Sequence, residues 1–232
     1  MKKIATILEN LFSFFYPRLC VSCNNTLRTK EKFFCLHCQC NLPETNYHEL
    51  ENHPLLYTFM GRVNVQFTAS YLFYRKGNSV QHILHELKYK GNKELGEYLG
   101  YNYGVQLKNI IKDKKVDFIL PIPLHKKKEK RRGYNQSEWI AKGLSKGFEI
   151  PYLSDVLLRV DFTETQTKKS RFNRWENVKN VFQIHNEELI KNKHVLVCDD
   201  VLTTGATMEA ALKELIKVEG VSVSVITLAV TG

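Results

Sequence analysis

Two almost continuously apolar runs stand out along the chain, at residues 195–198 and 221–230. Runs without polar alternation are typical of strands that are buried on both faces of a parallel sheet. Further strands are expected near residues 117 and 156, and segments with helical spacing lie between the strands. Because strands and helices alternate in this way, we predict an α/β fold with a doubly wound, mostly parallel sheet.

Helices and one further strand region follow from the same pattern. Apolar residues at helical spacing run from 78 to about 90, where Gly91 suits a C-cap. Lys88 and Lys90 at this end either complement the negative end of the helix dipole or contact a substrate, and the sequence leaves both interpretations open. The other segments are a strand-rich stretch at 63–74 and helices at about 93–111, 133–146 and 208–217.

The N-terminal stretch has apolar residues at helical spacing and ends at Pro17, which predicts a docking helix over residues 1–17. It imitates a signal peptide, but Glu9 and Asn10 interrupt it and no small-residue cleavage site follows. It is also too short to span a bilayer. We therefore expect a cytoplasmic protein without stable membrane insertion, with attachment to a membrane surface as the alternative.

A small cysteine-rich module is predicted at residues 18–45. It contains two CxxC pairs, and four thiolates from such pairs form the tetrahedral set that structural Zn²⁺ prefers. In so short a segment, metal binding would itself drive folding. The predicted ligands are Cys20, Cys23, Cys35 and Cys38.

Nearby side chains leave the ligand set partly open, since Cys40 or His37 could replace one of the four thiolates. The two CxxC pairs are the simpler choice. Disulfides are the other interpretation, but a chain without an export signal is expected in the reducing cytosol. Cys198 lies in the apolar run at 195–198 and is expected to be a small buried hydrophobe.

Residues 195–207 carry the strongest chemical signal and read VLVCDDVLTTGAT. The buried strand leads into Asp199 and Asp200, where a parallel sheet opens towards its ligand. Unpaired N–H groups at the start of the next helix favour a phosphate, whereas the carboxylates suit sugar hydroxyls or a hard cation such as Mg²⁺. A phosphorylated sugar satisfies both halves of the pattern better than a merely capped turn does. The loop consists of Thr203, Thr204, Gly205, Ala206 and Thr207.

This segment resembles the phosphoribosyl pyrophosphate (PRPP) motif of type I phosphoribosyltransferases. In that family the two acids contact the ribose 2′ and 3′ hydroxyls, and the loop wraps the 5′-phosphate. The resemblance carries these roles to Asp199, Asp200 and residues 203–207. The P-loop is the rival phosphate motif, and its Gly-Lys-Ser/Thr ending does not occur in this segment.

Positive charge is concentrated in two further segments. The chain has a formal net charge of +10, which indicates polyanionic ligands such as diphosphates or nucleic acid. Residues 126–132 hold six positive charges and one negative charge, and they are expected to form a basic loop between a strand and a helix. Residues 163–178 form a second long basic stretch without clear periodicity, of the kind that is usually functional or disordered.

Over nearly its whole length the chain resembles the ComF family. The resemblance includes the double CxxC, the LKYKG segment at 87–91, the PIPL segment at 121–124 with RGYNQ at 132–136, and the acid-pair motif. It implies a phosphoribosyltransferase-like domain at 46–232, with hood elements at about 60–91. Lys169 and Asn180 depart from the residues that the family often has.

The same resemblance implies roles for several basic residues. The loop after Pro121 would meet the diphosphate, and the 163–178 stretch would close over the active site as a lid. The implied catalytic residues are Asp199, Asp200 and Arg174, and the implied PRPP-binding residues outside the acid-pair motif are Pro121, Lys126 and Arg132. Lys127, Lys128 and Arg131 are further candidates for stabilising the diphosphate, together with Mg²⁺.

We therefore expect a PRPP-binding, phosphoribosyltransferase-like protein, with an acceptor that the sequence does not identify. The ComF resemblance implies a role in DNA uptake and competence. The alternative is a non-catalytic accessory that binds single-stranded DNA through its basic segments. A competence helicase is a further partner that the zinc module could bind.

Overall fold

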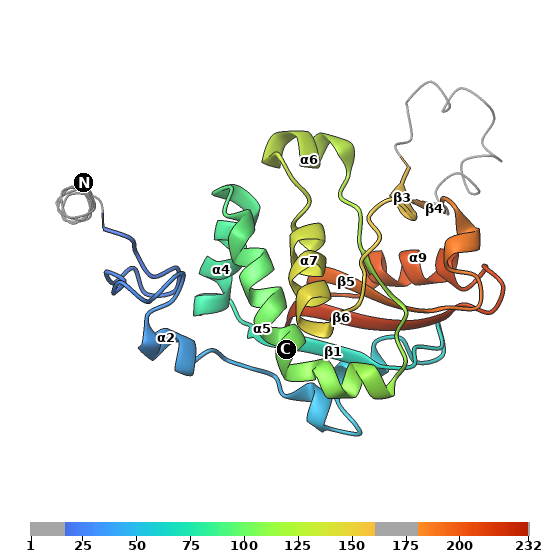
Figure 1. The fold of residues 1–232 in the computed structure, drawn as a ribbon, viewed down its shortest axis with the longest axis horizontal. Helices are drawn as coiled ribbons and strands as arrows, with labels where there is room; N and C mark the ends of the chain where they lie inside the picture. Colours follow the sequence, from blue (N-terminus) through green and yellow to red (C-terminus); the bar gives the residue numbers. More distant parts are fainter. Residues whose placement is uncertain (1–16, 161–180, 232) are drawn as a thin grey trace.

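The computed structural model describes residues 17–160 and 181–231. Its centre is a sheet of four strands in the order β1-β6-β5-β2, and every neighbouring pair is parallel (Figure 1). The predicted doubly wound parallel sheet is thereby confirmed. The strands are β1 (Thr68–Tyr74), β6 (Ser222–Thr231), β5 (His194–Leu202) and β2 (Phe118–Pro121).

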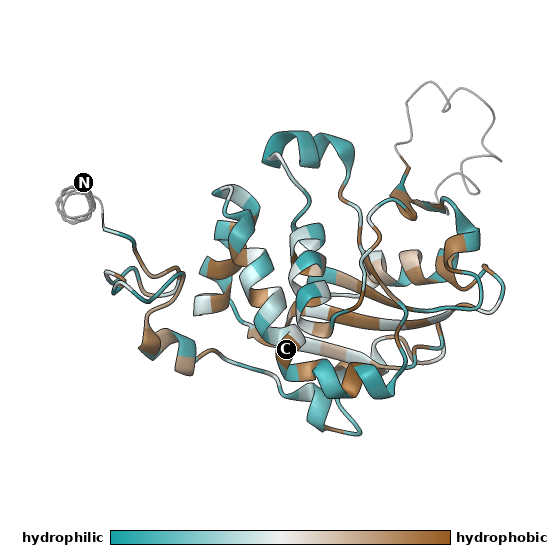
Figure 2. Ribbon diagram, in the orientation of Figure 1, coloured by the Kyte–Doolittle hydropathy of each residue, from teal (hydrophilic) through white to brown (hydrophobic). Residues whose placement is uncertain are grey.

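Hydrophobic side chains cover both faces of this sheet, as the unbroken apolar runs predicted. Along β5, Leu196 and Cys198 belong to one core, whereas Val195 and Val197 belong to the core on the other face. Figure 2 shows the central strands as largely hydrophobic. The buried thiol of Cys198 fits the small hydrophobe that the sequence indicated.

Helices lie on both faces of the sheet, as expected for a doubly wound fold. The core that contains Leu196 is completed by α4 (Ser79–Tyr89), α5 (Lys93–Asp113) and α7 (Gln136–Phe148). The other core is completed mainly by α9 (Ala206–Leu215). Gly91 follows α4 with a φ of +70°, in the left-handed conformation expected of a residue just beyond a helix end.

Helices α5 and α7 pack unusually closely because glycines line their contact. A Cβ added to Gly147 would lie 2.7 Å from the Cα of Gly104, and one added to Gly143 would clash with the carbonyl oxygen of Glu97. These neighbours are backbone atoms, which cannot turn away as a side chain can. The close contact fixes the position of α7, whose first turn reaches the acid pair.

Two sequence expectations were wrong in detail. The strand expected near residue 156 is β3 (Leu157–Arg159), which lies outside the central sheet and pairs antiparallel with β4 (Phe182–Ile184). Instead, Tyr152 forms a parallel bridge to Ile119 at the edge of β2. The basic segment expected as a loop is a short helix, α6 (Lys126–Arg132), with Gly133 at its C-cap.

Between residue 17 and the sheet, the structure has the short helices α2 (Leu36–Cys40), η1 (Tyr47–Glu49) and α3 (Pro54–Tyr57). A further short helix, η3 (Glu187–Leu189), precedes β5. From the range 60–91, for which we predicted a hood, β1 joins the central sheet and α4 packs against it. Within the described ranges, no helix is both long enough and apolar enough to cross a membrane.

Some predictions concern residues that the structure does not describe. The docking helix at 1–17 lies outside the described residues except for Pro17, and the lid at 163–178 lies outside them entirely. Arg174, Lys169 and Asn180 also fall in the gap between the two described ranges.

Candidate functional site

Asp199 and Asp200, the acid pair, lie where the central sheet opens. The last pairing between β2 and β5 joins Pro121 to Cys198, so among the described strands β5 continues beyond β2 with β6 alone as its partner. The acid pair therefore occupies the first positions of β5 that β2 does not cover. This is the carboxyl edge of the parallel strands, the usual place for ligands in open α/β sheets.

The carboxylate of Asp200 is buried and already has partners. Lys88 Nζ, from the end of α4, lies 3.1 Å from Asp200 Oδ2. Gln136 Nε2, at the start of α7, donates a hydrogen bond of 3.0 Å to the same oxygen. The residue is only 7% exposed. Lys88, for which the sequence left open a helix-dipole role or a substrate contact, thus meets the acid pair.

Asp199 is held by α7 and by its own backbone. Ser137 Oγ donates to Asp199 Oδ1 over 2.7 Å, and the backbone N–H of Asp200 donates to the same oxygen over 2.8 Å. Burial and the neighbouring charge of Asp200 raise the pKa of Asp199, while the bond from Ser137 lowers it. Asp199 is thus more easily protonated than an ordinary aspartate.

Residues 134–137 tie the surrounding segments to the acid pair. The Tyr134 hydroxyl donates to the carbonyl of Leu87, beside Lys88, and Asn135 Nδ2 donates 3.0 Å to the carbonyl of Ile122 beyond β2. Asn135 Oδ1 also accepts the N–H of Ser137 and caps α7. Each of the four side chains in this row therefore bonds to a different segment or residue around the site.

We did not predict functional roles for Gln136 and Ser137. An N-capping Asn at the start of α7 was readable from the sequence, and it fixes the direction of the two side chains that follow. Their partners are residues of β5 more than 60 positions away, as the two hydrogen bonds show. That pairing depends on the α5–α7 packing and could not be read from local sequence.

The threonine loop (residues 203–207) connects the acid pair to α9. Its threonines are exposed, whereas Gly205 is buried at a φ of +78°. A Cβ on Gly205 would lie 2.7 Å from Thr58 Cγ2, so only glycine lets the loop approach the turn after α3 so closely. Arg62, from the same turn, holds Glu209 of α9 with an ion pair of 2.7 Å. The loop thus presents hydroxyls and the N-terminus of α9 at the sheet edge.

A cationic pocket of about 460 Å³ lies beside Lys88. Lys88, Tyr89, Arg131 and Arg132 line it. The guanidinium of Arg132 lies 5.5 Å from the centre of the Tyr89 ring, and its Nε is buried without a hydrogen-bond acceptor among the described residues. Three positive side chains around one pocket form a site suited to an anion.

The remaining predicted residues are distributed unevenly. Pro121 is buried at the end of β2, next to Cys198, and Arg132 lines the cationic pocket. Lys126 is exposed at the start of α6, and no contact within the described ranges joins it to the acid pair. The structure therefore gathers the acid pair and Arg132 around Lys88, and leaves Lys126 at the far end of its helix.

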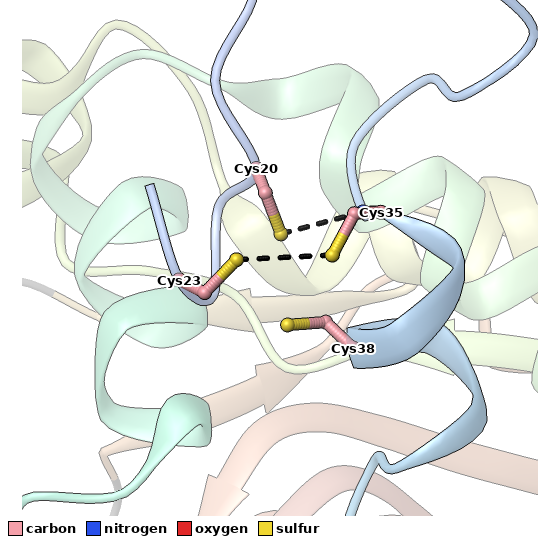
Figure 3. Close-up of side chains that lie close together, drawn as sticks. All are labelled: Cys20, Cys23, Cys35 and Cys38. Atoms are coloured by element: carbon pink, nitrogen blue, oxygen red, sulfur yellow. Dashed lines mark hydrogen bonds between the residues drawn. The ribbon is translucent and has the colours of Figure 1, made fainter. Parts of the chain in front are cut away.

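A separate cysteine cluster lies in the N-terminal module, where the four predicted sulfurs all fall within 4.8 Å of one another. Figure 3 shows their side chains converging from a loop and from the start of α2. The Sγ atoms of Cys23 and Cys35 are 3.7 Å apart, close to the spacing of about 3.8 Å that a tetrahedron with Zn–S bonds of about 2.3 Å requires. Cys20 Sγ also accepts the backbone N–H of Cys35 over 3.4 Å. The donor set therefore fits a structural metal ion.

The two alternative ligands stay outside this cluster. Cys40 is exposed, and the ring of His37 lies 3.5 Å from the side-chain amide of Asn41. The cysteine module also packs against the larger domain, because the centre of the Phe33 ring lies 5.2 Å from the centre of the Tyr98 ring on α5. The two CxxC pairs are thus the set that the fold brings together.

Comparisons with known proteins agree with this geometry. The phosphoribosyl transferase domain family matches residues 135–231, which include α7, the acid pair and the threonine loop. Competence protein F of Haemophilus influenzae is 37% identical over 100 residues, which cover 43% of this chain and 44% of that protein. In that match this chain spans less than half the length of its relative.

Two further relatives match over more of the chain. DNA utilization protein YhgH of Escherichia coli (strain K12) is 27% identical over 207 residues, which cover 86% of this chain and 84% of that protein. Competence protein ComFC of Bacillus subtilis (strain 168) is 29% identical over 157 residues, covering 67% of this chain and 61% of that protein. Together these matches support a ComF-family protein with a domain of the phosphoribosyltransferase type.

Proposed function

We propose that this protein binds PRPP at the carboxyl edge of its sheet and acts as a phosphoribosyltransferase on an acceptor still to be identified. The arrangement at the end of β5 carries this proposal. There two residues separate the acid pair from the threonine loop, and Lys88 joins the acid pair to the cationic pocket. One sugar that carries a phosphate and a diphosphate has groups to match all three parts.

Each part suits one group of PRPP. Carboxylates accept hydrogen bonds from hydroxyls, so the acid pair suits the ribose 2′ and 3′ hydroxyls. The hydroxyls of the threonine loop and the free N–H groups of α9 suit the 5′-phosphate. Lys88, Arg131 and Arg132 suit the diphosphate, since phosphate oxygens form strong charge-assisted hydrogen bonds with such side chains.

Transfer would take place at ribose C1. The bond from C1 to the diphosphate oxygen breaks and its electron pair leaves with the diphosphate, while the acceptor forms a new bond to C1 and loses a proton. The cationic pocket would stabilise the negative charge of the departing diphosphate. Carboxylate oxygens are ligands that Mg²⁺ prefers, so the acid pair also fits this ion, which when bound would neutralise charge on the diphosphate.

A thermal-shift measurement tests the binding step. PRPP with Mg²⁺ should raise the melting temperature, and the double variant Asp199→Asn with Asp200→Asn should lose that rise, because neutral amides are poorer hydroxyl acceptors. Asp117→Asn is the matched control. This aspartate pairs with Lys193 and the N–H of His194, at the opposite end of β5, so the variant should keep the PRPP shift. An acid-pair variant that still shows the full shift would refute the proposal.

The cellular role we propose is in DNA uptake or utilization, which rests on the names of the relatives.

A second function, binding of single-stranded DNA, is favoured by α6. Its lysines and Arg131 are exposed, and Figure 2 shows the helix as hydrophilic. Tyr134 cannot serve as a stacking platform because it is buried, whereas Tyr89 next to the cationic pocket is 61% exposed. Such a ring beside arginines could stack on a base.

A salt titration separates this second function from PRPP binding. Lys126, Lys127 and Lys128 lie outside the cationic pocket. Changing all three to Gln should reduce the slope of log affinity against log salt for single-stranded DNA by about 2. The PRPP-dependent thermal shift should stay as in the wild type. DNA binding that is absent, or insensitive to salt, would exclude this function.

We also propose that the cysteine cluster holds a structural Zn²⁺ ion. Zinc binding would supply folding free energy to a module that has little apolar core of its own. A helicase or another competence partner could bind this module.

A further inference from the structure

Lys88 lies between the acid pair and the cationic pocket. Its Nζ contacts Asp200 Oδ2 at 3.1 Å, and the same residue lines the pocket with Arg131 and Arg132. The side chain is 21% exposed, so it is partly open to a ligand from solvent. A lysine on a flexible four-carbon stem can serve either neighbour, but its single charge favours one strong anionic partner at a time.

In the structure, Lys88 contacts the carboxylate oxygen of Asp200 with which a sugar hydroxyl would have to form its hydrogen bond. Asp200 Oδ2 takes both Lys88 Nζ and Gln136 Nε2, and the carboxylate is almost fully buried. A ribose hydroxyl that approaches Asp200 must therefore compete with an ammonium group. The ammonium group has the advantage in that competition, because its full positive charge adds a Coulomb attraction to the carboxylate that a neutral hydroxyl lacks.

Once an anion is bound in the cationic pocket, it attracts the Lys88 ammonium group more strongly than Asp200 does. None of the ion pairs within residues 17–160 and 181–231 involves Arg131 or Arg132, and Arg132 Nε is a buried donor with no acceptor there. The pocket is thus an anion site whose charge the described part of the chain leaves unbalanced. A diphosphate placed there would carry more charge than one carboxylate.

Gln136 supplies a second, independent sign of a ligand. Its Nε2 is used by Asp200, but its Oε1 is buried and has no donor among the described residues. An unpaired buried acceptor is unfavourable, and a ligand hydroxyl would satisfy it. The residue itself is 2% exposed, so such a hydroxyl can reach it only after a neighbouring side chain moves.

We propose that Lys88 makes sugar binding depend on the diphosphate. The ammonium group leaves Asp200 for a diphosphate held by Arg131 and Arg132, and this frees Asp200 and Gln136 for the ribose hydroxyls. A sugar that carries a diphosphate thus draws Lys88 away and makes Asp200 and Gln136 available to its hydroxyls. A sugar monophosphate must instead compete with the ion pair between Lys88 and Asp200. This inference rests on PRPP being the ligand and adds the residue that selects it over ribose 5-phosphate.

The test compares two ligands on Lys88→Gln by isothermal titration calorimetry at one Mg²⁺ concentration. PRPP should bind about tenfold or more weakly, because a charged contact to phosphate is lost. Ribose 5-phosphate should bind more tightly than to the wild type, because its competitor for Asp200 is gone. Lys88→Arg should restore preference for PRPP, since the positive charge returns.

Lys90→Gln is the matched control, because Lys90 is exposed at the same end of α4 and lines no part of the pocket. It should leave both affinities unchanged. Equal weakening of both ligands by Lys88→Gln, with an unchanged melting temperature, would make Lys88 an ordinary ligand contact and overturn the inference. Wild-type protein that binds neither ligand would instead refute the proposed function itself, so the two failures can be told apart.

Discussion

The cysteine cluster and the acid pair are both sites of converging side chains, but different forces hold them in place. The four sulfurs lie on a short loop and around a five-residue helix that has no buried residue, and Cys20 is the member of the cluster that is buried in the core of the larger domain. The acid pair is anchored by α4, α7 and β5, whose side chains fill the core of the larger domain. We infer that the first site needs its ion to keep its shape, whereas the backbone of the second is in place before any ligand binds and only the side chain of Lys88 has to move.

Metal removal should give the largest effect and should be confined to the first site. Structural zinc sites contribute on the order of 10 kcal/mol of apparent binding free energy, so chelation or Cys38→Ser should unfold the cysteine module. The expected readout is rapid proteolysis within residues 18–45, with loss of one zinc per chain. The domain that holds the acid pair should keep its PRPP-dependent thermal shift.

Cys40→Ser provides the control for this experiment, because Cys40 is exposed and lies outside the cluster. It should retain zinc and resist proteolysis as the wild type does. If Cys40→Ser loses zinc as fully as Cys38→Ser does, the two CxxC pairs are not the complete ligand set. If Cys38→Ser abolishes the PRPP shift as well, measured with Mg²⁺ present, the two sites are not independent.

A smaller effect is expected from disturbing the helix contact that positions the acid pair. Gly143→Ala forces a Cβ against the backbone of Glu97 and should destabilise the protein by roughly 1–3 kcal/mol in a denaturant titration. PRPP affinity should fall with it, because α7 carries Gln136 and Ser137. Gly96→Ala is the control. Its Cβ would meet only side chains, of which Leu87 is nearest at 3.2 Å, so both stability and affinity should change less.

The smallest effect concerns a single hydrogen bond and is visible in its pH dependence. Ser137→Ala removes the donor to Asp199 Oδ1 and should cost about 1 kcal/mol. This bond favours the ionised carboxylate, so it lowers the pKa of Asp199, and its stabilisation is present at high pH and is lost as pH falls. The variant should therefore lose more stability at about pH 8 than at about pH 5. An equal loss at both values would show that the bond does not depend on the charge of Asp199.

The sequence predicted the sheet and the acid pair well because both depend on local patterns. The apolar runs at 195–198 and 221–230 identified central strands, and the order of strand, acids, loop and helix placed Asp199 and Asp200 at the sheet edge. Apolar runs, and the order in which they alternate with segments of helical spacing, can be recognised without knowledge of tertiary contacts. The same holds for the double CxxC, whose spacing alone predicted the cluster.

The parts that were missed depend on contacts between distant segments. Nothing local distinguishes Ser137 from another helix-start serine, yet it bonds to a carboxylate 62 residues away. The segment near 156 pairs with β4 rather than with the central sheet. Which strand it pairs with depends on tertiary packing and not on its own sequence. The basic run at 126–132 was expected to be a loop, but its lysines and arginines are good helix formers and Gly133 ends the helix.

A crystal structure with PRPP and Mg²⁺ tests the central claim most directly. We predict that the ribose hydroxyls contact Asp199 and Asp200, that the 5′-phosphate lies on residues 203–207, and that Lys88 has turned from Asp200 to the diphosphate. A ligand bound elsewhere, or a bound ribose with Lys88 still on Asp200, would contradict this claim.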